Sequence, residues 1–459
     1  MASPRRSLTG WGLTNPTVAD VFEVPNHEVR DALKGVTPRG ALVRGLGRSY
    51  GDAAQNAGGV VLRLLGAAHQ AVLDPVRGTV TVPAGVSIDD LLRVIVPRGF
   101  FVPVSPGTRF VTIGGAIASD IHGKNHHGEG SFGNHVHSLT MLLADGSQVV
   151  VGPHQEPQLF WATVGGMGLT GVILDATVQL LPIETSLMSV DTMRMPDLDS
   201  LLSAMEEGDD DYRYSVAWID PQATGRSLGR SVLGRGDHAS LEQLEPNDAI
   251  EPLSYNARQR VTMPPLVPPM GFINHATVAA FNEMWYRKAP RRREGELQSI
   301  AAFFHPLDMV GRWNRIYGRR GMLQYQIVVP FGAEKTMRTV IERFSASGAA
   351  SFLAVLKRFG PASLAPLSFP TPGWTLTLDV PAGTAGLGEL LHSLDCLVLD
   401  AGGRHYFAKD AATTPEAVRR GYPRLAEWQA VRSRVDPHGM WQSDLARRLH
   451  LLDPPEDMA

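Results

Sequence analysis

The chain has little of three things on which many proteins depend: cysteine, surplus positive charge and long apolar runs. Its one cysteine is Cys396, which excludes an internal disulfide and a cluster of metal-binding thiolates. Its 43 basic and 46 acidic residues leave a net charge of -3. We therefore expect no nucleic-acid partner, because such binding depends on excess positive charge. No stretch approaches the roughly 18 apolar residues of a membrane-spanning helix, and residues 1–22 lack the apolar segment of a signal peptide.

Length and composition are those of a globular protein of more than one domain. The chain has 459 residues, of which 43% are hydrophobic. At roughly 100–200 residues per domain, this length predicts two domains.

A glycine-rich stretch from Val43 to Asp52 follows the apolar run Ala41-Leu42-Val43 and precedes another, Val60 to Leu65. Glycines at positions 45, 47 and 51 indicate a loop of exposed backbone N–H groups after a strand, which is typical of a phosphate site. It differs from the dinucleotide motif G-x-G-x-x-G because its third glycine comes one residue late, no helix follows, and no acidic residue stands about 20 positions on. A plain glycine-rich turn is the alternative.

The following segments predict a mixed fold. Thr79 to Val82 alternates β-branched residues, and Ser87 to Val96 has a serine cap and apolar residues at helical spacing. Small residues from Gly114 to Ser119 would let a flat group approach the backbone closely. A third glycine cluster, Gly165 to Gly171, leads into a strand from Val172 to Val178. Glycine turns between strands and helices describe an α+β domain wrapped around an extended cofactor.

The character of the sequence changes near Leu180. Strand-like runs follow, such as Tyr214 to Ile219 and Leu323 to Val329, and in the second Gln324 and Gln326 alternate with apolar residues. This pattern predicts a sheet with one polar face over a polar substrate. The proline-rich, basic segment 261–295 is either a flexible surface loop or a lid or membrane-facing patch.

The sequence offers weak signals for two further kinds of site, a metal centre and a hydrolase nucleophile. Five histidines lie between His122 and His137, and His122 with His126 has the i, i+4 spacing of a helical metal site. Four glycines in this stretch make a helix improbable, so we expect no metal. Gly47-Arg48-Ser49-Tyr50-Gly51 lacks the strand-serine-helix context of a hydrolase nucleophile.

Several longer motifs carry a resemblance. Arg44 to Asp52, Pro106-Gly107-Thr108 and Thr112 to Ala116 resemble the FAD-binding fold of the vanillyl-alcohol oxidase superfamily. A second set of motifs resembles, more narrowly, the decaprenylphosphoryl-ribose 2-oxidase family of actinobacteria; these motifs are residues 120–127, 130–135, 159–166, 305–309 and 406–410. Enzymes of that family are the flavin half of an epimerase that makes the arabinose donor for cell-wall arabinan. The resemblance implies a two-domain α+β fold, with an FAD-binding domain at 1–186, an antiparallel-sheet substrate domain at 187–403, and a segment at 404–459 that completes the first domain.

The resemblance also implies the cofactor site. FAD pyrophosphate would lie in the first glycine loop, with the flavin ring beside residues 114–121. Covalent members of the superfamily carry a histidine in this loop, but here Tyr50 stands in that place, and Cys396 is distant from the motifs, so non-covalent FAD is expected. The implied contacts are Arg44, Gly45, Leu46, Gly47, Arg48, Ser49, Tyr50, Gly51, Pro106, Gly107, Thr108, Thr112, Gly114, Gly115, Ala116, Ser119, Asp120, Ile121, His122, Gly123, Asn125, Val172 and Tyr406.

Substrate and catalytic residues are implied in the same way. Hydride would pass from ribose C2 to the flavin, with Lys409, Tyr50 and His122 at the ring. The implied substrate contacts are Lys124, Gln324, Gln326, Lys357, Thr375 and Thr377. The chain departs from the mycobacterial pattern at Trp374-Thr375-Leu376-Thr377, where those enzymes have asparagine and cysteine in place of the two threonines. The sequence does not decide which group takes the hydroxyl proton.

The implied partners are a lipid-linked sugar phosphate and an NAD-dependent reductase that completes the epimerisation. We therefore expect peripheral association with the cytoplasmic or periplasmic face of the cell membrane. Two alternatives stay open: a soluble alditol or sugar-lactone oxidase built on the same flavin domain, and a flavin-free protein that binds a carbohydrate or lipid phosphate.

Overall fold

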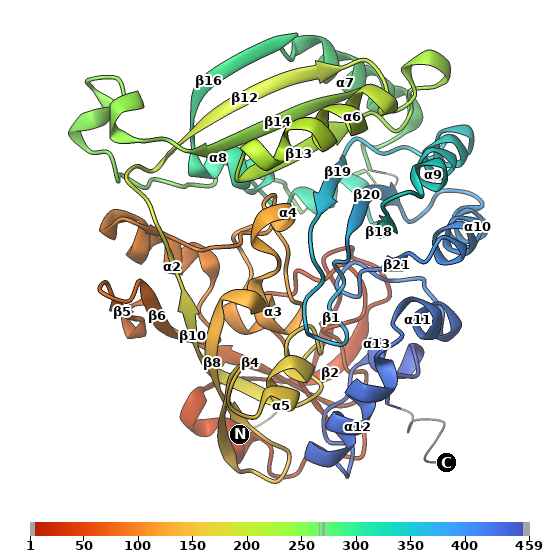
Figure 1. Cartoon of the computed structure of the whole chain (residues 1–459). Coiled ribbons are helices and arrows are strands. Elements are labelled where there is room, and N and C mark those ends of the chain that lie inside the picture. Colours follow the sequence, from red (N-terminus) through yellow and green to blue (C-terminus); the bar gives the residue numbers. More distant parts are fainter. Residues whose placement is uncertain (1–4, 266, 269–270, 453–459) are drawn as a thin grey trace.

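Two small sheets and one large sheet divide the molecule into a lower and an upper part (Figure 1). The computed structural model describes residues 5–265, 267–268 and 271–452. This arrangement confirms the two-domain α+β fold predicted from the sequence.

The first small sheet carries the glycine loop. Its order is β1-β2-β4-β3, and β3 and β2 both run parallel to β4. The strands are β1 Arg5–Leu8, β2 Thr17–Pro25, β3 Ala41–Val43 and β4 Val60–Leu65. The predicted strand, loop and strand are confirmed, because the chain leaves β3, crosses residues 44–59 and returns as β4.

The second small sheet is antiparallel and has the order β5-β6-β10-β8-β9. The strands are β5 Val72–Asp74, β6 Thr79–Pro83, β8 Val136–Leu142, β9 Gln148–Val151 and β10 Val172–Gln179. Helix α2 (Ile88–Ile95) begins where predicted: the Ser87 hydroxyl accepts the Asp90 backbone N–H at 3.0 Å. Ile88, Leu91 and Ile95 are buried on its inner face.

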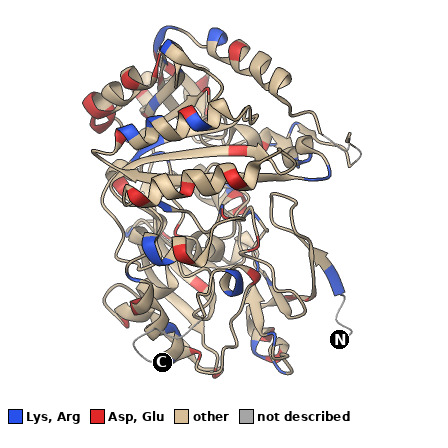
Figure 2. Cartoon of the chain, turned by 90° about the vertical axis from the view of Figure 1, so that its right-hand side faces the viewer, with Lys and Arg blue, Asp and Glu red and all other residues tan. Residues whose placement is uncertain are grey.

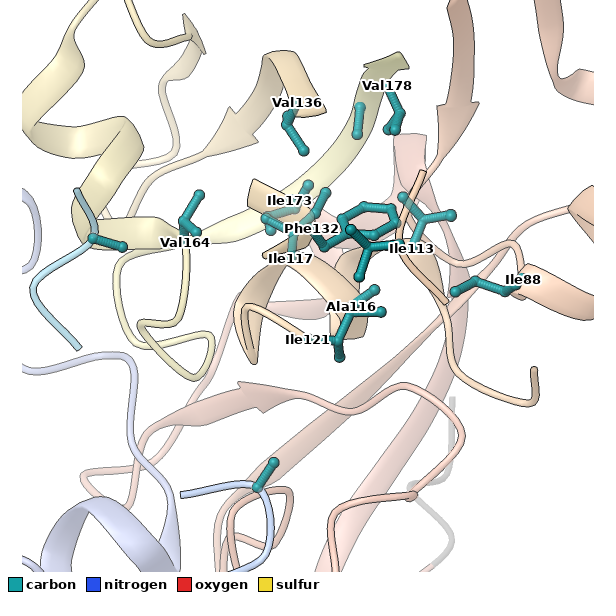
Figure 3. Close-up of a cluster of buried hydrophobic side chains, with 14 of the residues drawn as sticks. Ile88, Ile113, Ala116, Ile117, Ile121, Phe132, Val136, Val164, Ile173 and Val178 are labelled. Atoms are coloured by element: carbon teal, nitrogen blue, oxygen red, sulfur yellow. The ribbon is translucent and has the colours of Figure 1, made fainter. Parts of the chain in front are cut away.

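Helix α3 (Ile113–Ala118) occupies the small-residue segment, for which the sequence indicated close approach but no helix. Glycines 114 and 115 are poor helix formers. Tertiary contacts offset this, because Ile113 and Ile117 are completely buried in the core cluster that also holds Phe132 and Ile173 (Figure 3).

The large sheet has the order β16-β12-β14-β13-β19-β20-β18-β21. Its strands are β12 Leu187–Met195, β13 Tyr214–Ile219, β14 Ser231–His238, β16 Arg292–Ser299, β18 Met322–Pro330, β19 Ala354–Phe359, β20 Gly373–Pro381 and β21 Arg404–His405. One face packs its apolar residues against α6 (Leu198–Gly208), α9 (Glu334–Ala346) and α10 (Leu387–Asp400). The other face carries the polar residues of β18 and β20, so the predicted one-sided strand pattern is confirmed.

The C-terminal helices return to the first part of the chain and lie beside its strands (Figure 1). They are α11 Pro415–Gly421, α12 Leu425–Val435 and α13 Asp444–Arg448. Trp428 of α12 donates its indole N–H to the Ala162 carbonyl of α5 (Pro157–Thr163) at 2.9 Å. Arg448 pairs with Asp52 at 2.7 Å and Asp410 at 2.8 Å. These contacts hold the segment around residue 409 against the glycine loop.

Segment 261–295 is more ordered than a flexible loop. It contains β15 (Val261–Thr262), which pairs in parallel with β17 (Val310–Gly311), and α7 (His275–Lys288). The Asn274 side chain caps α7 by accepting the N–H groups of Ala276 and Thr277. Residues 266 and 269–270 of this segment lie outside the described residues.

Short elements complete the chain: β7 Phe100–Phe101, β11 Leu181–Pro182, α1 Val29–Ala32, α4 His126–Glu129 and α8 Ile300–Phe304. The turn α4 corrects the expectation that glycines exclude a helix between His122 and His137, although it spans only four residues. Figure 2 shows Lys and Arg interspersed with Asp and Glu. Among the helices of the described ranges, none combines the length and apolar character needed to cross a bilayer.

Candidate active site

The glycine loop presents a row of free backbone donors. Within the described part of the chain, the N–H groups from Gly45 to Ser49 meet no acceptor. The Arg48 guanidinium stacks 3.9 Å from the Trp11 ring centre, and its buried Nε has no hydrogen-bond partner among the described residues. Arg44 is used internally, since it donates to the Ala54 and Thr9 carbonyls at 2.7 Å. The loop therefore offers backbone donors and one cation to an anion.

Glycines let this loop touch α3 and the segment around residue 409. A Cβ on Gly45 would lie 2.5 Å from Thr112 Oγ1, and a Cβ on Gly51 would lie 2.0 Å from the Asp410 carbonyl oxygen. Both distances are shorter than any side chain tolerates. Three segments that are distant in the sequence meet here only because these positions lack side chains.

The Pro106-Gly107-Thr108 turn is held by the upper part of the molecule. Asp308 accepts the Thr108 hydroxyl and the Arg109 backbone N–H, both at 2.8 Å. His305 Nε2 lies 2.8 Å from Ser105 Oγ. These bonds explain why the motif at 305–309 accompanies the flavin motifs: its side chains position a turn about 200 residues earlier.

His122 stands at the centre of an aromatic group below the large sheet. Its ring centre lies 4.9 Å from Phe359, 5.6 Å from Phe369 and 5.1 Å from Tyr406. Burial, with Lys357 nearby, holds the pKa of His122 well below 6.5, so the ring is neutral at physiological pH.

His126, the other member of the i, i+4 pair, is engaged elsewhere. Its Nδ1 accepts the Gly360 N–H at 3.1 Å, and its Nε2 lies 3.2 Å from Ser131 Oγ. In the described ranges no three His, Cys, Asp or Glu side chains come together in a way that could hold a metal ion.

The polar face of the large sheet supplies the residues predicted to bind substrate. Gln326 on β18 lies opposite Thr377 on β20, and Lys357 on β19 lies opposite Thr375. Gln326 Nε2 is 3.2 Å from Thr375 Oγ1. The antiparallel register thus gathers three strands into one polar surface that faces His122.

Two lysines stand near this surface in different states. Lys124 donates to the Phe303 carbonyl at 2.5 Å and lies 4.0 Å from the Phe303 ring centre. Lys357 has neither an ion pair nor a hydrogen bond among the described residues. Burial lowers the pKa of each to about 7, and the charge of Lys357 adds to the effect on Lys124. Lys357 is therefore the cation available to an anionic ligand.

Lys409 and Tyr50 complete the site. Lys409 Nζ lies 4.1 Å from the centre of the Tyr50 ring. Burial raises the pKa of Tyr50 well above 10, so its hydroxyl is neutral. Tyr406 donates its hydroxyl to the Ser119 carbonyl at 2.8 Å, which ties the segment carrying Lys409 to the end of α3.

The predicted residues are not all gathered at one place. Val172 is completely buried in a separate apolar cluster with Leu142 and Trp441. Asn125 donates to the Pro103 carbonyl at 2.7 Å, and its Oδ1 is a buried atom with no partner among the described residues. The structure also brings in Phe359, Phe369 and Asp379, which sequence reasoning missed. Asp379 had one signal, the alternation Thr375, Thr377, Asp379 along β20.

These features fit FAD. Free N–H groups and Arg48 suit a pyrophosphate, and the close approach of Gly45 and Gly114 leaves backbone rather than side chains at the surface. A Cβ on Gly114 would lie 3.0 Å from the Ala84 Cβ. The aromatic and polar groups around His122 and Lys409 suit a flavin ring with a polar substrate over it.

Comparison with known proteins agrees with this geometry. Residues 26–152 match the family model of the FAD binding domain, and residues 386–449 match that of D-arabinono-1,4-lactone oxidase. The chain is 46% identical over 455 residues to decaprenylphosphoryl-beta-D-ribose oxidase of Mycolicibacterium smegmatis, covering 97% of this chain and 98% of that protein. It is 39% identical over 376 residues to an uncharacterized protein of Streptomyces coelicolor, covering 80% of this chain and all (100%) of that one. An alditol oxidase of a Streptomyces species is 27% identical over 178 residues, 38% of this chain and 42% of that enzyme.

Fold and site together define a flavoprotein oxidoreductase that uses FAD and acts on a CH–OH group. Within that class, the chain belongs to the decaprenylphosphoryl-beta-D-ribose oxidase family.

Proposed function

We propose that the protein oxidises the C2 hydroxyl of a polyprenylphosphoryl-β-D-ribose to the 2-keto sugar, as the first half of an epimerisation to the arabinose donor. The observation that carries the proposal is the placement of Lys357, a partly buried cation without an anionic partner among the described residues, on the same polar surface as Gln326 and Thr375. A phosphate next to a polyhydroxylated ring fits such a surface. The relative with 46% identity is named for this substrate.

FAD, when bound, supplies the two-electron acceptor for the hydrogen on C2. The chain's own residues orient the sugar: Lys357 pairs with the phosphate, and the side-chain oxygen of Gln326, whose NH2 group is held by His122 and Thr375, accepts a hydrogen bond from a sugar hydroxyl. His122 is neutral and contributes an uncharged ring nitrogen to the surface where the sugar would bind. Lys409 lies against Tyr50, where a cation stabilises negative charge that develops on the reacting oxygen.

Anaerobic reduction of the flavin tests the proposal. The purified protein is mixed with farnesylphosphoryl ribose or with free alditols, and absorbance near 450 nm is followed. The lipid-linked sugar should bleach the flavin and yield the 2-keto sugar, whereas alditols should not. Bleaching by alditols alone would favour a soluble alditol oxidase, and a protein that cannot take up FAD would favour a flavin-free binding protein.

The FAD should be dissociable. Tyr50 stands where covalent members of the superfamily have histidine, and Cys396 is exposed on α10. Acid precipitation should leave the yellow colour in the supernatant. Colour that stays with the pellet would contradict a non-covalent link.

A lipid-linked substrate implies contact with a membrane surface, and α7 is the element we propose for it. Phe281, Met284, Trp285 and Lys288 recur at helical spacing, and Met284 and Trp285 are exposed by 56% and 42%. Sedimentation with anionic vesicles should be reduced in Trp285→Ala. Phe331→Ala removes another exposed aromatic, 41% exposed, and should sediment like the unaltered protein.

An NAD-dependent reductase is the partner that the proposed reaction requires. A 2-keto sugar becomes the arabinose epimer only when hydride returns to C2 from the opposite face. Conversion of the lipid-linked ribose to arabinose should therefore need this protein, such a reductase and NADH together.

A further inference from the structure

Asp120 occupies a turn position at which glycine is the usual residue. It follows α3 and has a positive φ of 38°. The Ile121 N–H bonds to the Ala116 carbonyl at 3.0 Å, and the Asp120 N–H bonds to the Ile117 carbonyl at 3.0 Å. These two bonds form the Schellman ending of a helix. Glycine adopts this left-handed conformation without strain, whereas a residue with a Cβ does not. The presence of aspartate is therefore explained by what its side chain binds.

Both carboxylate oxygens of Asp120 are bonded within the protein. The residue is completely buried. Oδ1 accepts the Gly133 backbone N–H at 2.9 Å, and Oδ2 accepts the Ser368 hydroxyl at 2.5 Å. Burial raises the pKa of Asp120 to about 6, and the bond from Ser368 opposes this rise, so the group is mostly ionised at pH 7. Hydrogen bonds to an ionised carboxylate are among the stronger ones in proteins. The bond to Ser368 joins segments 248 positions apart.

Ser368 belongs to the connection between β19 and β20, residues 360–372, which reaches from the large sheet into the lower part of the molecule (Figure 1). Residues 365–370 of this connection are buried. Ala365, Leu367 and Phe369 belong to the same core cluster as the buried residues of α3. The connection is thus part of the upper domain by sequence and part of the lower domain by packing.

Phe369, next to Ser368, links this contact to the candidate active site. Its ring centre lies 4.9 Å from that of Tyr406, with the two planes 24° apart, and 5.6 Å from that of His122. The ring centres of His122 and Tyr406 are 5.1 Å apart, so the three rings contact one another. Tyr406 also donates its hydroxyl to the carbonyl of Ser119 at the end of α3. A shift of Ser368 would therefore move the ring that packs against His122.

Resting on the proposed function, we propose that Ser368 and Asp120 are positioning residues for the sugar. Their hydrogen bond fixes Phe369, and Phe369 holds the His122 ring in place. Neither Ser368 nor Asp120 needs to contact the substrate, because both side chains are bonded within the protein. A sugar that is poorly aligned with the flavin reacts slowly even when it binds normally. Lys357 would still hold the phosphate, so turnover should change more than binding.

The kinetic test compares Ser368→Ala, Ser368→Thr and Ser351→Ala as FAD-loaded proteins. Ser368→Ala should lower kcat by about 10- to 100-fold, the range expected when a reacting group is slightly misplaced, while KM changes less than about threefold. Ser368→Thr keeps the hydroxyl and should recover part of kcat. A purely structural role would lower thermal stability and leave kcat of the folded, FAD-loaded protein unchanged.

Ser351→Ala is the matched control. Ser351 is also completely buried, and its hydroxyl donates to the Leu353 carbonyl at 3.2 Å. Its loss removes a buried hydrogen bond that does not involve the three rings, so kcat should stay unchanged.

Asp120→Gly, alone and combined with Ser368→Ala, tests whether the two residues act together. Glycine relieves the positive φ, so this variant should fold, but it removes the acceptor of the Ser368 hydroxyl. The double variant should be no slower than the slower single variant, because both changes break the same bond. Effects that multiply would overturn the proposal, and so would a Ser368→Ala kcat within about twofold of the unaltered protein.

Amide hydrogen exchange followed by mass spectrometry needs no substrate. The peptide that contains residues 365–370 should exchange faster in Ser368→Ala and Asp120→Gly than in the unaltered protein or in Ser351→Ala. Unchanged exchange in both variants would also overturn the proposal. Failure of farnesylphosphoryl ribose to bleach the unaltered protein would instead count against the proposed function, and the exchange measurement would still decide whether the bond holds the connection.

Discussion

His122 and Gln326 stand 204 positions apart in the chain, and their Nε2 atoms are 2.9 Å apart. The NH2 group of the Gln326 side chain can only donate, so His122 Nε2 accepts and Nδ1 carries the proton. Gln326 Nε2 also lies 3.2 Å from Thr375 Oγ1, and Thr375 donates to the Ile327 carbonyl at 2.8 Å. This chain of bonds leaves the Nδ1–H of His122 without a partner among the described residues.

His122 should therefore be neutral and protonated on Nδ1 across the physiological range. Burial holds its pKa well below 6.5, so the acid form appears only at lower pH. Nitrogen-15 NMR of the histidine-labelled protein should show this tautomer unchanged between pH 6 and 8. His122→Phe keeps a ring but loses the donor, and kcat/KM should fall by about 10- to 100-fold, the worth of one buried hydrogen bond to a substrate. A charged imidazolium at pH 7 would contradict the assignment.

Lys357 should bind the phosphate of the substrate. Lys357→Met should raise KM by about 10- to 100-fold with a smaller change in kcat, as expected for loss of one charge-assisted contact. Lys335→Met, an exposed lysine on α9, is the control and should change neither constant. An unchanged KM in Lys357→Met would place the phosphate elsewhere.

Substrate affinity should also depend on pH through Lys357. Its pKa in the ligand-free protein is lowered from 10.5 to about 7. The ammonium is thus present below about pH 7 and lost above it, so affinity for the phosphate should weaken as pH rises through this value. The dissociation constant of a polyprenyl phosphate, measured from pH 6 to 9, should show this change in the unaltered protein and lose it in Lys357→Met.

Gly45→Ala should cause the protein to lose most of its bound FAD. The new methyl would lie 2.5 Å from Thr112 Oγ1, the atom that caps α3 by accepting the Gly115 N–H at 3.1 Å. Displacing the cap costs about 1 kcal/mol of stability and moves the loop away from α3. Absorbance at 450 nm relative to 280 nm should fall after purification. Gly388→Ala, at an open and exposed position in α10, should keep full flavin content.

Thr377→Cys should create a site where a nitroaromatic inhibitor bonds to a thiol, because the resemblance to the mycobacterial pattern implies a cysteine at this position. Thr377 faces Gln326 across the sheet, so a thiol there would lie on the substrate surface. Intact-mass spectrometry after turnover with the inhibitor should show an adduct on the variant and none on the unaltered protein. An adduct on the unaltered protein would mean that another residue reacts.

Local signals in the sequence predicted much of the fold. Serine 87 predicted the start of α2, and the polar-apolar alternation at Gln324 and Gln326 predicted a strand with one polar face. Both signals arise from backbone sterics and side-chain direction, and these depend only on a few neighbouring residues. They can therefore be read from the sequence. The sequence did not predict the α3 helix because its glycines have low helix propensity. Burial of Ile113 and Ile117 in the core offsets that low propensity.

The sequence by itself determined the flavin class, through motifs long enough to be specific, and it named a set of site residues whose roles stay predictions. Tertiary structure alone decided which of these meet. Asp308 positions Thr108 across 200 residues, and Val172 lies in a separate core. Asp379 comes to Gln324 only because β18 and β20 pair in one register. No local pattern encodes such meetings, since they depend on how whole sheets pack.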